Sequence, residues 1–234
     1  MQTRLWRLTK NEEQLNEEKL NEAAVLIRAG EVVAFPTETV YGLGANGLDG
    51  KAVRKIFAAK GRPADNPLIL HIAEKSEIEK LTTGLSANAQ ALMQAFWPGP
   101  LTMVVPKSDI IPDEVSAGLD TVAVRMPVHP VARRRIALAG CPIAAPSANK
   151  SGKPSPTNAQ DVLEDMDGLI AGVIDGGSSN IGVESTVVDT TAPVPVILRP
   201  GGITKEMLEE VLGVVEIDPA LAGNSECKPK AQAM

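Results

Sequence analysis

Apolar residues recur along the chain at two spacings, and these spacings predict its secondary structure. Apolar positions three and four residues apart predict helices over residues 11–28, 51–60, 87–96, 129–140, 158–165 and 204–213. Short apolar runs predict strands over residues 31–35, 68–72, 101–105, 121–126, 142–146, 169–175, 185–189 and 195–199. Residues that commonly cap helices support these boundaries: Asp49, Ser86, Thr157 and Thr204 at N-termini, and Gly30 after the first helix.

The order of these segments predicts an α/β fold. Helices and strands are mixed throughout, and several strands follow one another closely near the end of the chain. That order favours a mixed sheet with flanking helices over a strictly alternating parallel sheet. The length of 234 residues fits one large domain. After Pro219 the apolar periodicity is lost, so we expect a catalytic domain over residues 1–218 and a linker-like tail over residues 219–234.

Charge and composition exclude several classes of function. A net charge of −6 argues against broad binding to nucleic acid. Cys141 and Cys227 have no disulfide or metal-site spacing, and His71 and His129 have no metal-ligand spacing. No segment has the composition of a signal peptide or a membrane span, so we expect a cytoplasmic protein without membrane contact.

The stretch "GLGANG" fits the spacing of a dinucleotide-binding fingerprint, but its context does not. Six residues separate the preceding strand from Gly42, and "LDG" separates Gly47 from the next helix. In a dinucleotide site the glycines follow the strand directly and open the helix. We therefore expect a turn at these glycines, and we expect the polar residues of "PTET" just before them to be partnered.

Cations stand at strand ends and loops of this acidic chain. Lys60 and Arg62 lie at the end of a predicted helix and in the loop there, whereas Arg125 and Arg199 end apolar strands. Ser147 and Asn149 follow another strand and offer directional hydrogen bonds. Individually each has an ordinary structural explanation, such as a helix end or a turn. Together they suit a polyanionic nucleotide, whose transfer reactions need positioning and charge neutralisation more than a protein nucleophile.

Several motifs in register resemble one known family. The motifs "FPTETVYGLGAN", "KGRP" with "NPL", "TVAVRMP", "APSAN", "GVESTVVD" and "LRPG" occur between about Gly30 and Gly202. Their order and spacing resemble those of the threonylcarbamoyl-AMP synthase family, in particular the N-terminal catalytic domain of its long, two-domain form. The tail "KPKAQAM" resembles the start of that form's linker, and Gln232 and Ala233 stand where Pro and Gly are usual.

The resemblance implies a fold and an activity. The family fold is an open, twisted α/β sheet around a large concave, basic cavity. Its members are nucleotidyltransferases that condense L-threonine, bicarbonate (as carbon dioxide) and ATP into threonylcarbamoyl-AMP, releasing pyrophosphate. The implied cofactor is Mg²⁺ carried by ATP, with no metal ligand from protein side chains. A partner complex would then transfer the threonylcarbamoyl group to tRNA, which this chain would meet only weakly or indirectly.

The resemblance also implies a role for individual residues. The catalytic signature falls on Lys60, Arg62, Ser147 and Asn149, which would bind the ATP phosphates and nucleotide together with Asn66, Thr121 and Arg199. The threonine site maps to Thr37, His71, Arg125, Ala145 and Ser185. Arg125 would pair with the threonine carboxylate, and His71 would act either as a base or as a neutral hydrogen-bond partner.

Two alternatives stay open at this point. The first is an RNA-binding module of the same fold without synthase activity, although stacking aromatics are scarce. The second is a related carbamoyl-adenylate enzyme of hydrogenase maturation. Such domains usually belong to longer chains with zinc-finger-like segments, and this sequence has none of the cysteine spacing that such segments need.

Overall fold

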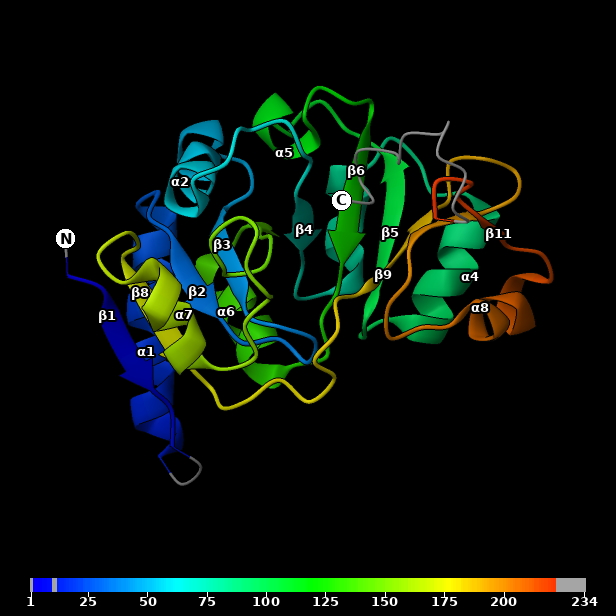
Figure 1. The fold of residues 1–234 in the computed structure, drawn as a ribbon. Helices are drawn as coiled ribbons and strands as arrows, with labels where there is room; N and C mark the ends of the chain where they lie inside the picture. The colour runs from blue at the N-terminus through cyan, green and yellow to red at the C-terminus, as the bar shows by residue number, and fades with distance from the viewer. Residues whose placement is uncertain (1, 10–11, 222–234) are drawn as a thin grey trace.

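A mixed sheet of eleven strands forms the framework of the molecule (Figure 1). The computed structural model describes residues 2–9 and 12–221. Along the sheet the strands follow the order β1-β8-β2-β3-β7-β4-β6-β5-β9-β10-β11, with parallel and antiparallel pairs both present, which confirms the predicted mixed sheet. The strands are β1 Arg4–Arg7, β2 Val33–Phe35, β3 Gly42–Asn46, β4 Ile69–His71, β5 Leu101–Pro106, β6 Thr121–Arg125, β7 Ile143–Ala144, β8 Gly172–Asp175, β9 Thr186–Asp189, β10 Val196–Arg199 and β11 Glu216–Ile217.

Helices flank this sheet, and the six predicted helices begin within two residues of their predicted starts. The helices are α1 Glu13–Arg28, α2 Gly50–Lys60, α3 Ile78–Leu81, α4 Ala87–Phe96, α5 Asp113–Ser116, α6 Pro130–Ala139, α7 Ala159–Met166 and α8 Lys205–Leu212, with a short 3-10 turn at Lys75–Glu77. Helices α3 and α5 were not predicted. Asp49, Ser86 and Thr204 cap their helices as predicted, because each side chain accepts a hydrogen bond from the first turn. The cap at Thr157 is wrong by one residue: Asn158 accepts from the Asp161 backbone N–H at 2.9 Å.

The turn predicted at "GLGANG" is also wrong for most of that stretch. Gly42 to Asn46 form strand β3, which pairs antiparallel with β2, and only Gly47 lies in a turn. The glycines are needed for close packing instead. A Cβ at Gly44 would lie 2.8 Å from both Ile143 Cγ2 and the Phe35 ring. A side chain at this position would therefore collide with the core beneath the strand.

Alternate residues of the central strands enter two separate apolar cores. Ala34 contributes to the larger core, which contains Ile56 of α2, whereas Val33 and Phe35 contribute to a second core with residues of α1 and α6. Helices α1 and α6 pack against each other. The alternation is the period-two pattern of a strand with both faces covered.

The register of β4 and β6 places polar side chains on the face opposite the larger core. The two strands run parallel, with Ile69 opposite Ala123 and His71 opposite Arg125. Leu70 and Val124, which alternate with them, lie in the larger core. His71 and Arg125 are therefore neighbours on one face of the sheet.

None of the helices in the described part of the chain is both long and apolar enough to cross a membrane. Residues 222–234, most of the predicted tail, lie outside the described residues. The division between a domain over residues 1–218 and a tail therefore stays a prediction.

Candidate functional site

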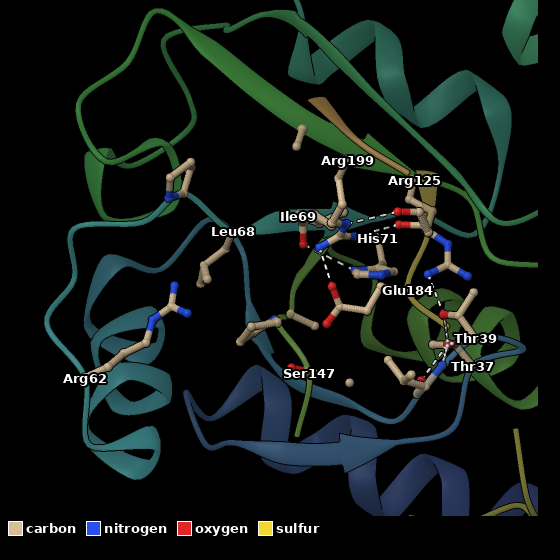
Figure 2. A pocket seen from close by; sticks show the side chains of 17 residues that line it. Thr37, Thr39, Arg62, Leu68, Ile69, His71, Arg125, Ser147, Glu184 and Arg199 are labelled. Carbon is tan, nitrogen blue, oxygen red and sulfur yellow. Dashed lines mark hydrogen bonds and ion pairs between the residues drawn. The ribbon is translucent and has the colours of Figure 1, made fainter. Parts of the chain in front are cut away.

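A pocket open to solvent lies over the polar face of β4 and β6 (Figure 2), and its free space, with the solvent at its mouth included, is about 810 Å³. The strands supply its floor, and loops that follow β2, α2, β7 and β8 supply its walls. Three arginines contribute positive charge, and Glu184 is the single carboxylate among the described lining residues. The lining residues are Thr37, Thr39, Val40, Gly42, Arg62, Pro67, Leu68, Ile69, His71, Ala123, Arg125, Ala145, Pro146, Ser147, Glu184, Ser185 and Arg199.

The segment after β2 folds around the hydroxyl of Thr37. Thr37 Oγ1 donates to Val40 O at 2.6 Å and accepts from the backbone N–H groups of Thr39 and Val40 at 3.2 and 3.3 Å. The hydroxyl lies 2.9 Å from Thr39 Oγ1. Local bonds of this kind let Thr close a tight turn. Thr37 therefore fixes the shape of this wall of the pocket and is only 2% exposed.

A buried ion pair joins this segment to β6. Arg125 Nη2 donates to Glu38 Oε1 at 2.6 Å, and Nη1 donates to Thr39 Oγ1 at 2.9 Å. Arg125 Nε donates to Gly99 O at 3.3 Å. Both charged side chains are almost fully buried, so the pair is largely shielded from bulk solvent although Arg125 also lines the pocket. This confirms that the polar residues of "PTET" are partnered and that Arg125 is paired inside its apolar strand.

His71 is a neutral imidazole beside Arg125. Burial, together with the nearby positive charge of Arg125, lowers the pKa of His71 to about 3. Its Nδ1 lies 3.2 Å from Ile69 O, and a carbonyl oxygen only accepts, so Nδ1 carries the proton and Nε2 is a hydrogen-bond acceptor. The edge of the Phe35 ring supports the imidazole, with ring centroids 6.0 Å apart at 89°. These features favour a hydrogen-bond partner over a base.

Arg199 and Glu184 form a second ion pair, which is more exposed than the first. Arg199 Nη1 lies 2.6 Å from Glu184 Oε2. Arg199 also donates to Ser185, through Nε to the carbonyl at 3.1 Å and through Nη2 to Oγ at 3.2 Å. Ser185 Oγ lies 2.7 Å from Thr102 Oγ1. Burial lowers the pKa of Arg199 from its ordinary value, although the group stays charged at neutral pH.

Arg62 lies across the pocket from Arg125, at the end of α2 (Figure 2). Its guanidinium lies 5.7 Å from the centroid of the Phe57 ring, and its buried Nε has no hydrogen-bond partner among the described residues. An unpaired buried donor costs free energy, so a ligand that accepts a hydrogen bond here would be favoured. Arg62 is therefore a cation available to an anionic ligand.

Comparison with known proteins places this site in a family. Residues 25–201 match the Sua5/YciO/YrdC family model, which is described as "Telomere recombination". The chain belongs to this family.

The chain is similar along its whole length to larger members of the Sua5/YciO/YrdC family. It is 56% identical over 222 residues to a Pyrococcus abyssi protein named threonylcarbamoyl-AMP synthase, covering 95% of this chain and 65% of the relative. A Bacillus subtilis protein of the same name is 53% identical over 236 residues, covering 100% of this chain and 68% of the relative. The chain therefore spans about two thirds of the length of these relatives.

A solved structure of the same family has the same fold. The crystal structure of Pyrococcus abyssi Sua5 complexed with L-threonine matches with a TM-score of 0.91 and 53% identity, covering 99% of this chain and 66% of that chain. This match confirms the predicted α/β architecture.

Most residues predicted for the Sua5/YciO/YrdC site gather in the pocket. The lining includes these predicted residues: Thr37, Arg62, His71, Arg125, Ala145, Ser147, Ser185 and Arg199. Lys60, Asn66, Thr121 and Asn149 are not among the lining residues. Asn66 lies half-buried in the loop after α2, and Thr121 begins β6 opposite Pro106. The ligand-binding roles of these residues stay predictions.

Lys60 lies behind the pocket and holds one of its walls. Its buried ammonium donates to Ser147 O at 2.5 Å, Asn149 O at 2.8 Å and Asn149 Oδ1 at 3.3 Å. Asn149 Nδ2 in turn donates to Lys150 O and Lys153 O at 3.0 and 2.7 Å. Burial, with a smaller contribution from Arg62, lowers the pKa of Lys60 to about 8. Lys60 and Asn149 thus shape the loop that presents Ser147.

Several contributors to the site were not assigned by sequence reasoning, among them Glu184, which lines the pocket and pairs with Arg199. Glu38 and Thr39 anchor Arg125, and Thr102 supports Ser185. Glu38 carried a usable signal, because a carboxylate next to a buried strand requires a cation. Thr102 carried none, since a threonine in an apolar strand is common.

No group of three or more His, Cys, Asp or Glu side chains that could hold a metal ion occurs among residues 2–9 and 12–221. The only lining carboxylate of the described residues, Glu184, is already paired with Arg199. The donor set of the pocket fits phosphate oxygens better than a bare cation.

Proposed function

We propose that this chain synthesises threonylcarbamoyl-AMP from L-threonine, bicarbonate (as carbon dioxide) and ATP. The observation that carries the proposal is the division of the pocket. Arg125, Thr37 and neutral His71 lie on one side, and Arg62 lies on the other (Figure 2). The names of the relatives and the threonine complex of the Pyrococcus protein support this assignment.

Threonine fits the side of the pocket that contains Arg125. With three of its N–H groups bonded to protein atoms, Arg125 offers its remaining N–H groups to the threonine carboxylate. His71 Nε2 accepts a hydrogen bond from the substrate hydroxyl or amine. Thr37, Ala145 and Ser185 complete the contact surface of this subsite.

ATP fits the remaining part of the pocket. Arg62 and Arg199 bind and neutralise its phosphates, and Ser147 donates a hydrogen bond from the loop. Lys60 and Asn149 act from behind by holding that loop, and the charge of Lys60 adds to the positive field. Asn66 and Thr121, which are not among the lining residues, would support the nucleotide as the resemblance implies. Mg²⁺ arrives with ATP, bound to the phosphates rather than to protein carboxylates.

The reaction needs no protein nucleophile. Threonine loses its ammonium proton, and the neutral amine forms a bond to carbon dioxide, releasing a second proton and leaving a carbamate. A carbamate oxygen then bonds to the α-phosphorus of ATP, while the bond from that phosphorus to the bridging oxygen of the β-phosphate breaks. Pyrophosphate leaves against Arg62 and Arg199. The adenylate is consumed by a separate transferase complex that modifies tRNA.

Product analysis tests the proposal directly. The chain is incubated with MgATP, labelled bicarbonate and each amino acid in turn, and the products are separated. We expect label to enter an adenylate only with threonine, with one pyrophosphate released for each adenylate. Label entering with every amino acid, or with none, would refute the assignment.

Two further measurements test the proposal against the RNA-binding alternative and test the role of Lys60. ATP plus threonine should raise the melting temperature, whereas stabilisation by tRNA alone would favour an RNA-binding module. Lys60→Ala should reduce threonine- and bicarbonate-dependent pyrophosphate release. Full release by this variant would remove Lys60 from the catalytic set.

A further inference from the structure

Glu184 places a carboxylate in the middle of the pocket. Its Oε2 lies 2.6 Å from Arg199 Nη1, and its Oε1 accepts a hydrogen bond from Ser155 Oγ at 3.0 Å. Figure 2 shows the side chain between Arg199 and Ser147. The carboxylate thus occupies the position where an anionic ligand of Arg199 would bind.

Arg199 does not depend on Glu184 for its position. The guanidinium also donates to the carbonyl and the hydroxyl of Ser185, and these bonds remain if Glu184 moves away. The Glu184 side chain is 34% exposed, so it has room to turn toward solvent. The other ion pair of the site differs in this respect, because the Glu38 side chain is only 7% exposed and does not line the pocket.

We propose that Glu184 is an internal competitor that reserves Arg199 for ligands carrying several negative charges. A single carboxylate that replaces Glu184 exchanges one ion pair for an equivalent one and gains little. A polyphosphate pairs with Arg199 and also reaches Arg62, so it gains more than the lost pair contributed. Glu184 thereby keeps amino-acid carboxylates out of the phosphate subsite. The inference deepens the proposed function and rests on its phosphate subsite.

Neutralising Glu184 should therefore strengthen polyphosphate binding. Glu184→Gln keeps the shape of the side chain but removes the competing charge; its amide oxygen can still accept from Arg199, and its NH2 group can donate to Ser155 Oγ. We expect the Kd for pyrophosphate to fall about 1.4- to fivefold, the range for losing a partly exposed ion pair. Acetate, as a probe of single carboxylates, should compete with pyrophosphate more strongly in the variant than in the wild type.

Isothermal titration calorimetry with sodium pyrophosphate and with ATP tests the proposal. Glu17→Gln is the matched control, because it makes the same charge change at an exposed ion pair with Arg134 outside the pocket. Tighter binding by Glu184→Gln with no change in Glu17→Gln supports the proposal. Equal binding overturns it, and so does weaker binding, which would make Glu184 a ligand of the polyphosphate or its metal.

The calorimetric result for Glu184→Gln can be told apart from the result of the product analysis that tests the proposed function. If label enters no adenylate but Glu184→Gln still tightens pyrophosphate binding, the synthase proposal fails and the competitor proposal stands. If labelled adenylate forms and the Kd for pyrophosphate is unchanged in Glu184→Gln, the synthase proposal stands and the competitor proposal fails. Absence of pyrophosphate and ATP binding by both proteins overturns the competitor proposal as well.

Discussion

The Glu38–Arg125 ion pair should be the most costly contact of the site to break. The side chains of Glu38 and Arg125 are 7% and 4% exposed, and Arg125 Nη2 lies 2.6 Å from Glu38 Oε1. Neutralising one partner of such a pair leaves an uncompensated buried charge, which costs about 3 to 5 kcal/mol. At about 2 to 4 °C for each kcal/mol in a chain of this size, Glu38→Gln should lower Tm by roughly 6 to 20 °C.

Urea denaturation and thermal unfolding measure this loss, with Glu17→Gln as the control. The Glu17–Arg134 pair is 42% and 53% exposed, so its loss should cost less than about 1 kcal/mol. A double variant, Glu38→Gln with Arg125→Gln, removes both charges and should recover part of the stability lost in either single variant. The reasoning fails if Glu38→Gln costs no more than the control, or if the two single losses simply add.

Three further predictions concern His71, Gly44 and Lys60. The pKa of His71 is about 3 in the folded protein and lies below its value in the unfolded chain, so the free energy of unfolding should fall as the pH drops from about 6.5 toward 3. Ring-nitrogen NMR should find His71 neutral throughout about pH 5 to 8, and a titration of His71 near pH 6.5 would contradict this. Gly44→Ala should cost about 1 to 3 kcal/mol in urea unfolding, whereas Gly84→Ala, whose Cβ meets nothing within 4 Å, should be close to neutral. Lys60→Met should increase hydrogen exchange in the loop after β7, because Lys60 holds that loop, whereas Arg62→Met should not. Both variants should weaken ATP binding. Equal hydrogen exchange in the two variants would refute the role of Lys60 in holding the loop.

The longer helices were predictable because their signals are local. Periodicity and capping residues mark α2, α4 and α8 within the segment itself. The edge strands β1 and β11 were missed for the opposite reason. Each is held by one parallel neighbour, β8 and β10 respectively, and β8 is far from β1 in the sequence. A strand of four residues or fewer has too little pattern of its own to predict it.

The same distinction applies to the strand at "GLGANG". Glycine disfavours strands in isolation, so local reasoning predicted a turn. The strand forms because the side chains of Phe35 and Ile143 pack directly against its backbone, where only glycine leaves them room. That requirement is set by tertiary packing, which the local sequence does not contain.

Motif reasoning predicted many of the residues that gather in the pocket but not what each one bonds. Arg125 and Glu38 are 87 positions apart, so their pairing depends on the sheet bringing β6 beside the loop after β2. Lys60 and Arg62 are neighbours in one motif, yet one faces a protein loop and the other the pocket. The two side chains diverge because the helix ends between them, with Gly61 in the left-handed conformation at φ 67°.

These pairings change how an acidic chain attracts a polyanion. Arg125 and Arg199 each have a carboxylate partner, so neither adds a full free charge to the pocket. Within the described part of the chain, Arg62 lines the pocket without a carboxylate in salt-bridge distance. The surplus of positive charge in the pocket is therefore small, and we expect polyphosphate binding to depend on exchanging the Glu184–Arg199 pair for a phosphate–Arg199 pair. Such an exchange conserves the number of ion pairs, which makes affinity depend on the geometry and charge density of the ligand more than on the overall field.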